Sequence, residues 1–173
     1  MKKVYLSLGS NIGKRERNLQ NAIDLLDSAN LRVIRISPVY ETEPMERRDQ
    51  PWFLNLVVEA ETGLFPLQLL QRIQRIEMEL GRKRLVAKGP RSIDIDILLY
   101  GSFVIRSARL EVPHPRLAQR RFVLEPLAEL APELRHPQSR RTIRELLAAV
   151  SGQTARKVSF QPRMSANLHG HNL

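Results

Sequence analysis

The order in which hydrophobic patterns follow one another is the feature that most constrains how this chain can fold. Alternating or β-branched apolar runs are typical of strands, whereas apolar residues repeated every three or four positions are typical of helices. These patterns predict a strand at 4–8, a helix at 18–26, strands at 31–42 and 52–61, a helix at 66–80 and a strand at 93–100. Strand, helix, strand, strand, helix, strand is the order of a split βαβ, or ferredoxin-like, unit. We therefore expect an α/β (α+β) fold with a ferredoxin-like βαββαβ core.

Local signals support the later elements of this assignment. Pro66 stands in the favoured first turn of its predicted helix, and Gly81 directly follows the last apolar position. Additional strands and helices are expected beyond the core, namely a hairpin after 101 and helices over 116–130 and 142–150, the second capped by Thr142.

The periodic patterns stop at Ser151. A length of 173 residues fits one domain, so we expect a single domain over 1–150 and a basic, poorly ordered tail over 151–173. Residues 135–173 carry seven Lys and Arg against one Glu, so they contribute +6 of the formal net charge of +10. This surplus suggests a polyanionic partner such as nucleic acid or phosphates, or simply a solvated tail.

Composition excludes several classes of protein. The chain has no cysteine, which excludes disulfides, Cys-ligated zinc, iron–sulfur clusters and thiol nucleophiles. No apolar run approaches the ~20 residues of a membrane helix. Ser7 and Gly9 interrupt the short apolar stretch that follows Lys2 and Lys3, so we expect no signal peptide and a cytoplasmic protein.

Two carboxylates lie on the predicted strand at 93–100. Asp94 and Asp96 are two positions apart, so the period of a strand puts both on one face and the neighbouring isoleucines on the other. Their Cα atoms would be ~6.5–7 Å apart, a spacing at which two carboxylates can share a pair of Mg²⁺ ions with phosphate oxygens. The alternative is an ordinary half-exposed strand whose two charges face water.

The loop before this strand is rich in cations. It contains Arg82, Arg84 and Arg91, and a rigid Gly-Pro turn stands directly before Arg91. Arginine forks beside metal-binding carboxylates suit the transfer of a phosphoryl group, although simple charge balance would use the same residues. Both interpretations of this loop remain open.

Further candidates are polar or aromatic groups near these carboxylates. Phe53 and Asn55 share one face of the third predicted strand and suit a flat heterocycle, although aromatic residues more often belong to a core. Gln74 and Glu77 stand one helical turn apart, as on any polar helix edge. His114 lies between two prolines, which would hold its imidazole either for a ligand or merely within a turn.

Together these residues resemble the 6-hydroxymethyl-7,8-dihydropterin pyrophosphokinase family of folate biosynthesis. The most specific match is Gly-Pro-Arg-Ser-Ile-Asp-Ile-Asp-Ile at residues 89–97, within a matching block that extends from Gly89 to Gly101. The other matching blocks are Leu8–Asn11, Ser37–Thr42, Asp49–Pro51 with Phe53–Asn55, Gln74–Arg84, and Val112–Pro115 with Arg120 and Phe122. They follow the family's order and span residues 4 to about 137.

The resemblance implies transfer of the β,γ-diphosphate of ATP to the hydroxymethyl group of the pterin, with release of AMP. It implies that Arg82, Arg91, Asp94 and Asp96 are catalytic and that Asp94 and Asp96 bind two Mg²⁺ ions. The implied ATP-binding residues are Gln74, Glu77, Arg84, Ile97, Arg109, His114 and Arg120. The implied pterin-binding residues are Thr42, Met45, Phe53, Asn55 and Phe122. We expect a monomer that acts on these two small molecules, with ATP as co-substrate, and binds neither nucleic acid nor a membrane.

Two rival functions would share this topology. An RNA-binding module would suit the positive charge, but Lys88-Gly89 is followed by Pro90 rather than by an aromatic residue, and Asp94 and Asp96 stand where base-stacking aromatics would be. A non-catalytic ligand-binding domain would not need the carboxylate pair and the arginine loop together.

Overall fold

A mixed sheet-and-helix architecture is built from strands and helices close to those that the patterns predict. The computed structural model describes residues 1–44, 49–81 and 92–165. Its elements in chain order are β1 (Lys2–Ser10), α1 (Arg15–Leu26), β2 (Leu31–Ile36), β3 (Tyr40–Thr42), β4 (Phe53–Thr62), α2 (Pro66–Glu79), β5 (Asp94–Tyr100), β6 (Ile105–Arg106), β7 (Glu111–Val112), the 3₁₀ helix η1 (Leu117–Gln119), α3 (Arg121–Leu130), α4 (Ile143–Ala149) and β8 (Ala155–Lys157).

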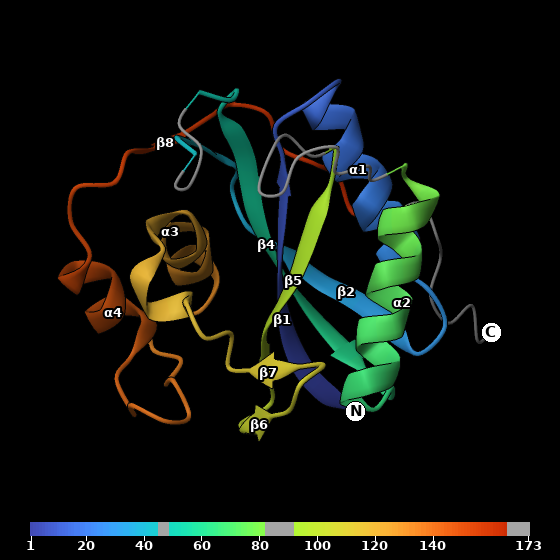
Figure 1. The fold of residues 1–173 in the computed structure, drawn as a ribbon, viewed down its shortest axis with the longest axis vertical. Coiled ribbons are helices and arrows are strands. Elements are labelled where there is room, and N and C mark those ends of the chain that lie inside the picture. Colours follow the sequence, from blue (N-terminus) through green and yellow to red (C-terminus); the bar gives the residue numbers. More distant parts are fainter. Residues whose placement is uncertain (45–48, 82–91, 166–173) are drawn as a thin grey trace.

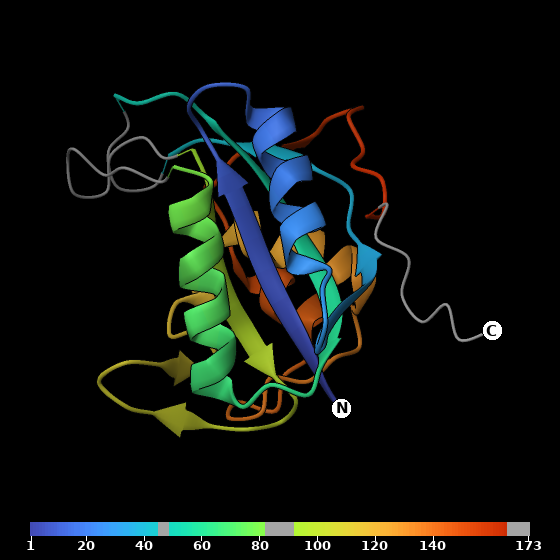
Figure 2. The same ribbon diagram turned by 90° about the vertical axis from the view of Figure 1, so that its right-hand side faces the viewer.

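The main sheet is antiparallel and has the strand order β5-β1-β4-β3-β8, with β2 also paired to β4. Helices α1 and α2 cover one face, and α3 and α4 cover the other (Figures 1 and 2). If β2 and β3 are counted as one interrupted strand, the core order is fourth, first, third, second. The structure therefore confirms the ferredoxin-like fold.

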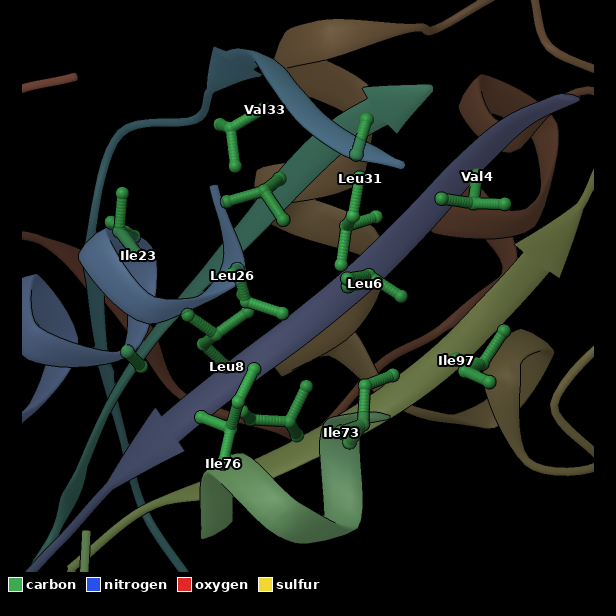
Figure 3. Packing of buried hydrophobic residues seen from close by; sticks show 14 of the residues in the cluster. Val4, Leu6, Leu8, Ile23, Leu26, Leu31, Val33, Ile73, Ile76 and Ile97 are labelled. Atoms are coloured by element: carbon green, nitrogen blue, oxygen red, sulfur yellow. The ribbon is translucent and has the colours of Figure 1, made fainter. Parts of the chain in front are cut away.

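Two hydrophobic clusters fill the spaces between the sheet and its helices. The first packs one face of β1 and β5 against α1 and α2, and Leu6, Leu8, Ile23, Ile73 and Ile97 belong to it (Figure 3). The second packs the opposite face against α3 and α4, through residues that include Tyr5, Val57, Leu98, Leu127 and Ile143. Because successive strand residues point to opposite faces, each central strand contributes to both clusters.

The strand predicted over 31–42 was wrong as one continuous element, because the chain leaves the ladder between β2 and β3. Ser37 interrupts it: the Ser37 backbone N–H donates to Val57 O at 2.9 Å, and Ser37 Oγ accepts from Val57 N at 2.9 Å. Pro38 follows and has no N–H for the ladder. The helix expected over 116–130 is likewise divided at Arg120, which is extended at φ −116° and ψ 105° between η1 and α3.

We expected a poorly ordered tail from Ser151 onward, but the residues up to Ser165 include a strand and make contacts with the domain. β8 pairs with β3, and Val158 and Phe160 pack against the first hydrophobic cluster. Further on, the Arg163 backbone N–H donates to Gln20 Oε1 at 3.0 Å. An edge strand such as β3 leaves backbone groups open for pairing, and a strand of three residues is too short to show a period in the sequence. Residues 166–173 lie outside the described part of the chain.

Within the described ranges, no helix combines the length and the apolar character that crossing a membrane would require.

Candidate active site

Asp94 and Asp96 lie on the face of β5 that is turned toward the α3 side of the sheet. Ile95 and Ile97 between and after them are buried in the first cluster, while both carboxylate residues are half-buried. The predicted alternation along this strand is confirmed. Asp94 pairs with Gly9 and Asp96 pairs with Ser7 on the neighbouring strand β1.

The strand register brings an amide residue beside these carboxylates. Gly9 of β1 pairs with Asp94 on one side and with Asn55 of β4 on the other, and Asn55 in turn pairs with Tyr40 of β3. Directly paired residues share a face, so Asn55 and Asp94 stand about 10 Å apart with a glycine between them. Because Gly9 has no side chain, the Asn55 amide oxygen and the Phe53 ring can lie close to its backbone. The hydrophobic pattern ended the predicted strand at residue 8 and did not indicate this role for Gly9.

The amide of Asn55 is held in a fixed orientation. Its Nδ2 donates to Thr42 Oγ1 at 2.5 Å, and the two residues are only 5% and 2% exposed. A Cβ placed on Gly9 would lie 2.7 Å from Asn55 Oδ1, so this oxygen is beside the glycine. Phe53, two residues earlier on β4, points to the same side and is half-buried. The sequence-predicted group Thr42, Phe53 and Asn55 is therefore brought together.

The short segment that leads into Phe53 is tied to the end of β1. Asn11 Nδ2 donates to Gln50 Oε1 at 2.9 Å and to Pro51 O at 3.0 Å. Asn11 is itself buried, so these bonds are shielded from water. These bonds consequently fix the path of the chain just before Phe53, the residue predicted to stack on the pterin.

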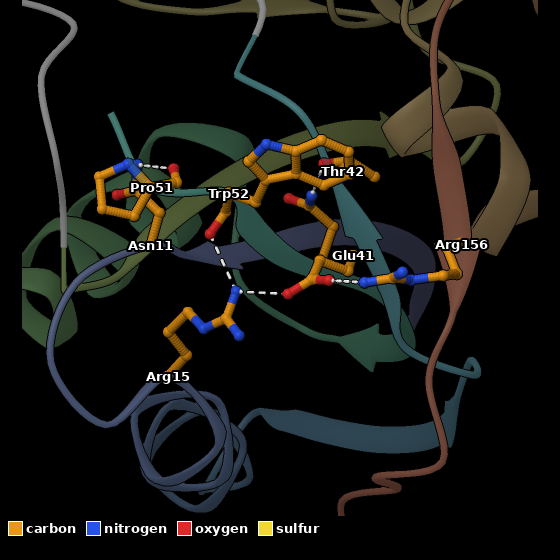
Figure 4. A network of polar contacts seen from close by, with 8 residues as sticks. Asn11, Arg15, Glu41, Thr42, Pro51, Trp52 and Arg156 are labelled. Carbon is orange, nitrogen blue, oxygen red and sulfur yellow. Dashed lines mark hydrogen bonds and ion pairs between the residues drawn. The ribbon is translucent and has the colours of Figure 1, made fainter. Parts of the chain in front are cut away.

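A second set of polar contacts surrounds Glu41 on β3 (Figure 4). Arg15 Nη1 lies 3.0 Å from Glu41 Oε2 and also donates to Trp52 O at 3.0 Å. Arg156 of β8 forms a further ion pair with Glu41. Burial alone would raise the pKa of Glu41, but hydrogen bonds from Arg156 and Arg15 outweigh it and hold the pKa below its ordinary value. The four residues link α1, β3, the residue before β4 and β8, and the pattern of charges in the sequence did not reveal this link.

A cavity of about 280 Å³ lies along the edge of β5. Asp96, Ile97, Arg109 and His114 line it, together with Leu70 of α2. Its volume is near the lower end of the range of small-molecule sites. The structure thus brings one predicted metal ligand and three predicted ATP-binding residues to one cavity.

His114 is fixed within this cavity by its own loop. Its backbone N–H donates to Leu98 O at 2.9 Å, and its Nδ1 accepts from the Arg116 backbone N–H at 3.1 Å. Burial, reinforced by the positive charges of Arg120 and Arg116 and partly opposed by Asp94, lowers the pKa of His114 to about 4. The imidazole is therefore neutral at pH 7, and because Nδ1 is an acceptor its proton is on Nε2. His114 can present an uncharged N–H donor to a ligand.

The two helix residues predicted for ATP differ in their placement. Glu77 is buried on α2 and accepts the backbone N–H of Ile95 at 2.9 Å, between the two aspartates of β5. This contact anchors α2 to the carboxylate-bearing strand. Gln74 is exposed on the same helix and is not among the residues that line the cavity.

Arg120 and Phe122 stand at the start of α3, across from β3 and β4. The Arg120 guanidinium lies 5.3 Å from the centre of the Phe122 ring. Phe122 also packs against the second hydrophobic cluster, so it has a structural role whatever it binds. The remaining predicted site residues, Arg82, Arg84, Arg91 and Met45, lie outside the described residues.

A family model described as 7,8-dihydro-6-hydroxymethylpterin-pyrophosphokinase matches residues 5–132 of the chain. Curated relatives named 2-amino-4-hydroxy-6-hydroxymethyldihydropteridine pyrophosphokinase include one from Pseudomonas aeruginosa, 44% identical over 86% of this chain and 92% of the relative. One from Bacillus subtilis is 49% identical over 76% of this chain and 79% of the relative.

Other relatives are longer proteins. The Schizosaccharomyces pombe folic acid synthesis protein fol1 is 45% identical over 90% of this chain, which spans 21% of the fungal protein. A Plasmodium falciparum HPPK-DHPS crystal structure superposes with a TM-score of 0.70 at 19% identity, over 85% of this chain and 45% of the solved one. This last likeness supports the fold.

Proposed function

The chain belongs to the 7,8-dihydro-6-hydroxymethylpterin-pyrophosphokinase family, and from this premise we propose that it transfers the β,γ-diphosphate of ATP to the hydroxymethyl group of 6-hydroxymethyl-7,8-dihydropterin, with release of AMP. The observation that carries the proposal is the row Asn55, Gly9, Asp94 across three strands. In this row, an amide that suits a heterocycle and a carboxylate that suits a metal stand on one face of the sheet, on either side of Gly9.

The pterin occupies the Asn55 side of this row. Asn55 and Thr42 recognise its polar edge, and the Asn55 amide is already oriented by its bond to Thr42. Phe53 and Phe122 stack on the two faces of the ring. Met45 is the remaining pterin-binding residue of this proposal.

ATP occupies the cavity along β5 and reaches the carboxylates. Ile97 provides an apolar wall, Arg109 a positive charge, and His114 its neutral Nε2–H donor. The other ATP-binding residues in this proposal are Gln74, Glu77, Arg84 and Arg120. Arg82 and Arg91 stabilise the negative charge that develops on the transferred group.

Asp94 and Asp96 are the residues that would hold two Mg²⁺ ions. Their oxygen donors suit this hard cation, and the described residues contain no cluster of three or more His, Cys, Asp or Glu side chains that would complete a cage of protein ligands. Such a donor set leaves coordination positions for phosphate oxygens. When bound, Mg²⁺ would supply neutralisation of the triphosphate charge. The chain's own contribution is placement, because the strand fixes both carboxylates on one face beside the pterin pocket.

The test is product analysis after incubation of the chain with ATP, Mg²⁺ and hydroxymethyl-dihydropterin. We expect AMP and a diphosphorylated pterin by mass spectrometry. Asp94→Asn and Asp96→Asn should each reduce turnover by about a hundredfold or more with an unchanged melting temperature. Asp24→Asn, a carboxylate on α1, is the matched control and should keep normal turnover. ADP as the main nucleotide product, or near-normal turnover in either site variant, would contradict the proposal.

A further inference from the structure

The start of α3 is held by a side chain from the C-terminal part of the protein. The N-cap residue Arg120 makes no side-chain capping hydrogen bond. Instead, Gln153 Oε1 accepts the backbone N–H of Arg121, the first residue of α3, at 2.8 Å. Gln153 Nε2 donates to Gln119 O, the last residue of η1, at 2.8 Å. One amide therefore spans the joint at Arg120, where the first N–H groups of a helix otherwise lack partners within the helix.

The same joint has a second connection to this segment. Arg121 Nη2 donates to Val150 O at 2.6 Å, and Arg121 Nη1 forms an ion pair with Glu125 at 2.9 Å. Both the backbone and the side chain of Arg121 thus contact residues that follow α4. The joint carries Phe122 directly after Arg121.

Two residues beyond Gln153, the chain reaches the opposite side of the proposed pterin pocket. Ala155 pairs with Thr42 in the β3–β8 ladder. Arg156 forms its ion pair with Glu41 on the same strand (Figure 4). Residues 150–157, which we call the C-terminal brace, therefore run from the start of α3 to β3 (Figure 1).

We propose that Gln153 is a positioning residue for pterin recognition. Through the C-terminal brace it fixes the α3 joint relative to β3, and so sets the gap between Phe122 and the Thr42–Asn55 pair. This inference rests on the proposed function, because that function makes the gap a pterin site. It adds a residue that the family resemblance did not assign, from a segment beyond the matched residues 5–132.

The inference predicts a selective effect on the two substrates. Loss of the Gln153 amide removes the hydrogen-bond partner of the Arg121 N–H and of the Gln119 carbonyl. The position of the Phe122 ring, directly after Arg121, is then less well fixed. The pterin KM and Kd should rise about fivefold, as expected for loss of a helix cap. The ATP values should change less than about twofold, because Gln74 and Glu77 of the proposed ATP site lie on α2 and Ile97 lies on β5, away from this joint.

The experiment compares Gln153→Ala with two further variants. Gln153→Glu keeps an acceptor for the helix N–H but turns a second acceptor toward the Gln119 carbonyl, so it should recover part of the pterin affinity. Gln161→Ala is the matched control, since Gln161 Nε2 donates to Ser37 O at 3.2 Å in the same C-terminal region, and we expect its pterin KM to equal that of the wild type. Each protein is assayed for pterin and ATP KM, kcat and melting temperature.

The outcomes separate this inference from the function on which it rests. A wild-type chain that forms no pterin diphosphate overturns the proposed function. An active wild type with an unchanged pterin KM in Gln153→Ala overturns the positioning role alone, as does an equal rise in both KM values or a lower melting temperature without a KM change. If Gln153→Ala does not fold, Gln153→Asn, which shortens the same amide, provides the same comparison.

Discussion

Gly9→Ala directly tests the close approach of the Asn55 side chain to the backbone of β1. A Cβ at this position would lie 2.7 Å from Asn55 Oδ1 and 3.4 Å from Phe53 Cδ1, whereas ordinary contact begins near 3.4 Å. Gly9 does not have a left-handed φ, so the cost is steric and not conformational. Relief therefore requires the Asn55 oxygen to move by about 0.7 Å.

Asn55 has little freedom to make that movement. It is buried and its Nδ2 donates to Thr42 Oγ1 at 2.5 Å, so displacement weakens a buried hydrogen bond. Overpacking costs about 1–3 kcal/mol and a lost hydrogen bond about 0.5–1.5 kcal/mol. We expect the free energy of unfolding to fall by about 2–4 kcal/mol, and the pterin KM to rise more than the ATP KM.

Urea unfolding followed by circular dichroism measures the stability change, and initial rates give the two KM values. Gly63→Ala is the matched control, because its Cβ would meet only the flexible Met1 Sδ at 3.5 Å among the atoms nearby, and we expect it to be nearly neutral. In an Asn55→Ala background, Gly9→Ala should lose most of its cost. A Gly9→Ala stability within about 0.5 kcal/mol of wild type, or the same cost in both backgrounds, would show that Asn55 does not obstruct a side chain at position 9.

Two further predictions concern Phe122 and His114. In isothermal titration, Phe122→Ala should raise the pterin Kd by the equivalent of ~1–3 kcal/mol and the ATP Kd far less. Phe103→Ala is the control, because Phe103 is exposed beside Tyr100. An equal loss of affinity for both ligands would make Phe122 a core residue only. Burial, and then the charges of Arg120 and Arg116, lower the pKa of His114 from 6.5 to about 4. As the pH falls, the unfolded chain therefore binds a proton at this histidine before the folded chain does. The free energy of unfolding should be highest above pH 6.5 and should fall by at most about 3 kcal/mol between pH 6.5 and 4. Burial also lowers the pKa of His136, so the contribution of His114 must be separated from it. Urea unfolding at both pH values should therefore compare wild type with His114→Asn. An equal loss of stability in the two proteins would contradict the assignment to His114.

The family resemblance and the fold class followed from the sequence, and both are confirmed. The resemblance rested on residues 89–97 together with five separate blocks, and the family model matches 5–132. The fold followed from patterns that act over a few residues. Alternation on β5 separates aspartates from isoleucines, and Thr142 Oγ1 accepts the Glu145 N–H at the start of α4, as the capping pattern predicts. The assignments of ATP, pterin and metal ligands came from the resemblance and stay predictions, although the structure places several of these residues together.

What the sequence by itself determined is therefore the local part: which segments are strands or helices, which side chains share a face, and where a helix begins. Strand register was decided only by the tertiary structure, and it alone sets Gly9 between Asn55 and Asp94. The tertiary structure also decided three further features: the break at Ser37, the pairing of β8 with β3, and the cap that Gln153 gives α3. The physical reason is range. Periodicity and capping depend on neighbours within one or two turns of chain, whereas these features join residues 20 to more than 100 positions apart, and their partners are selected by the packing of the whole sheet.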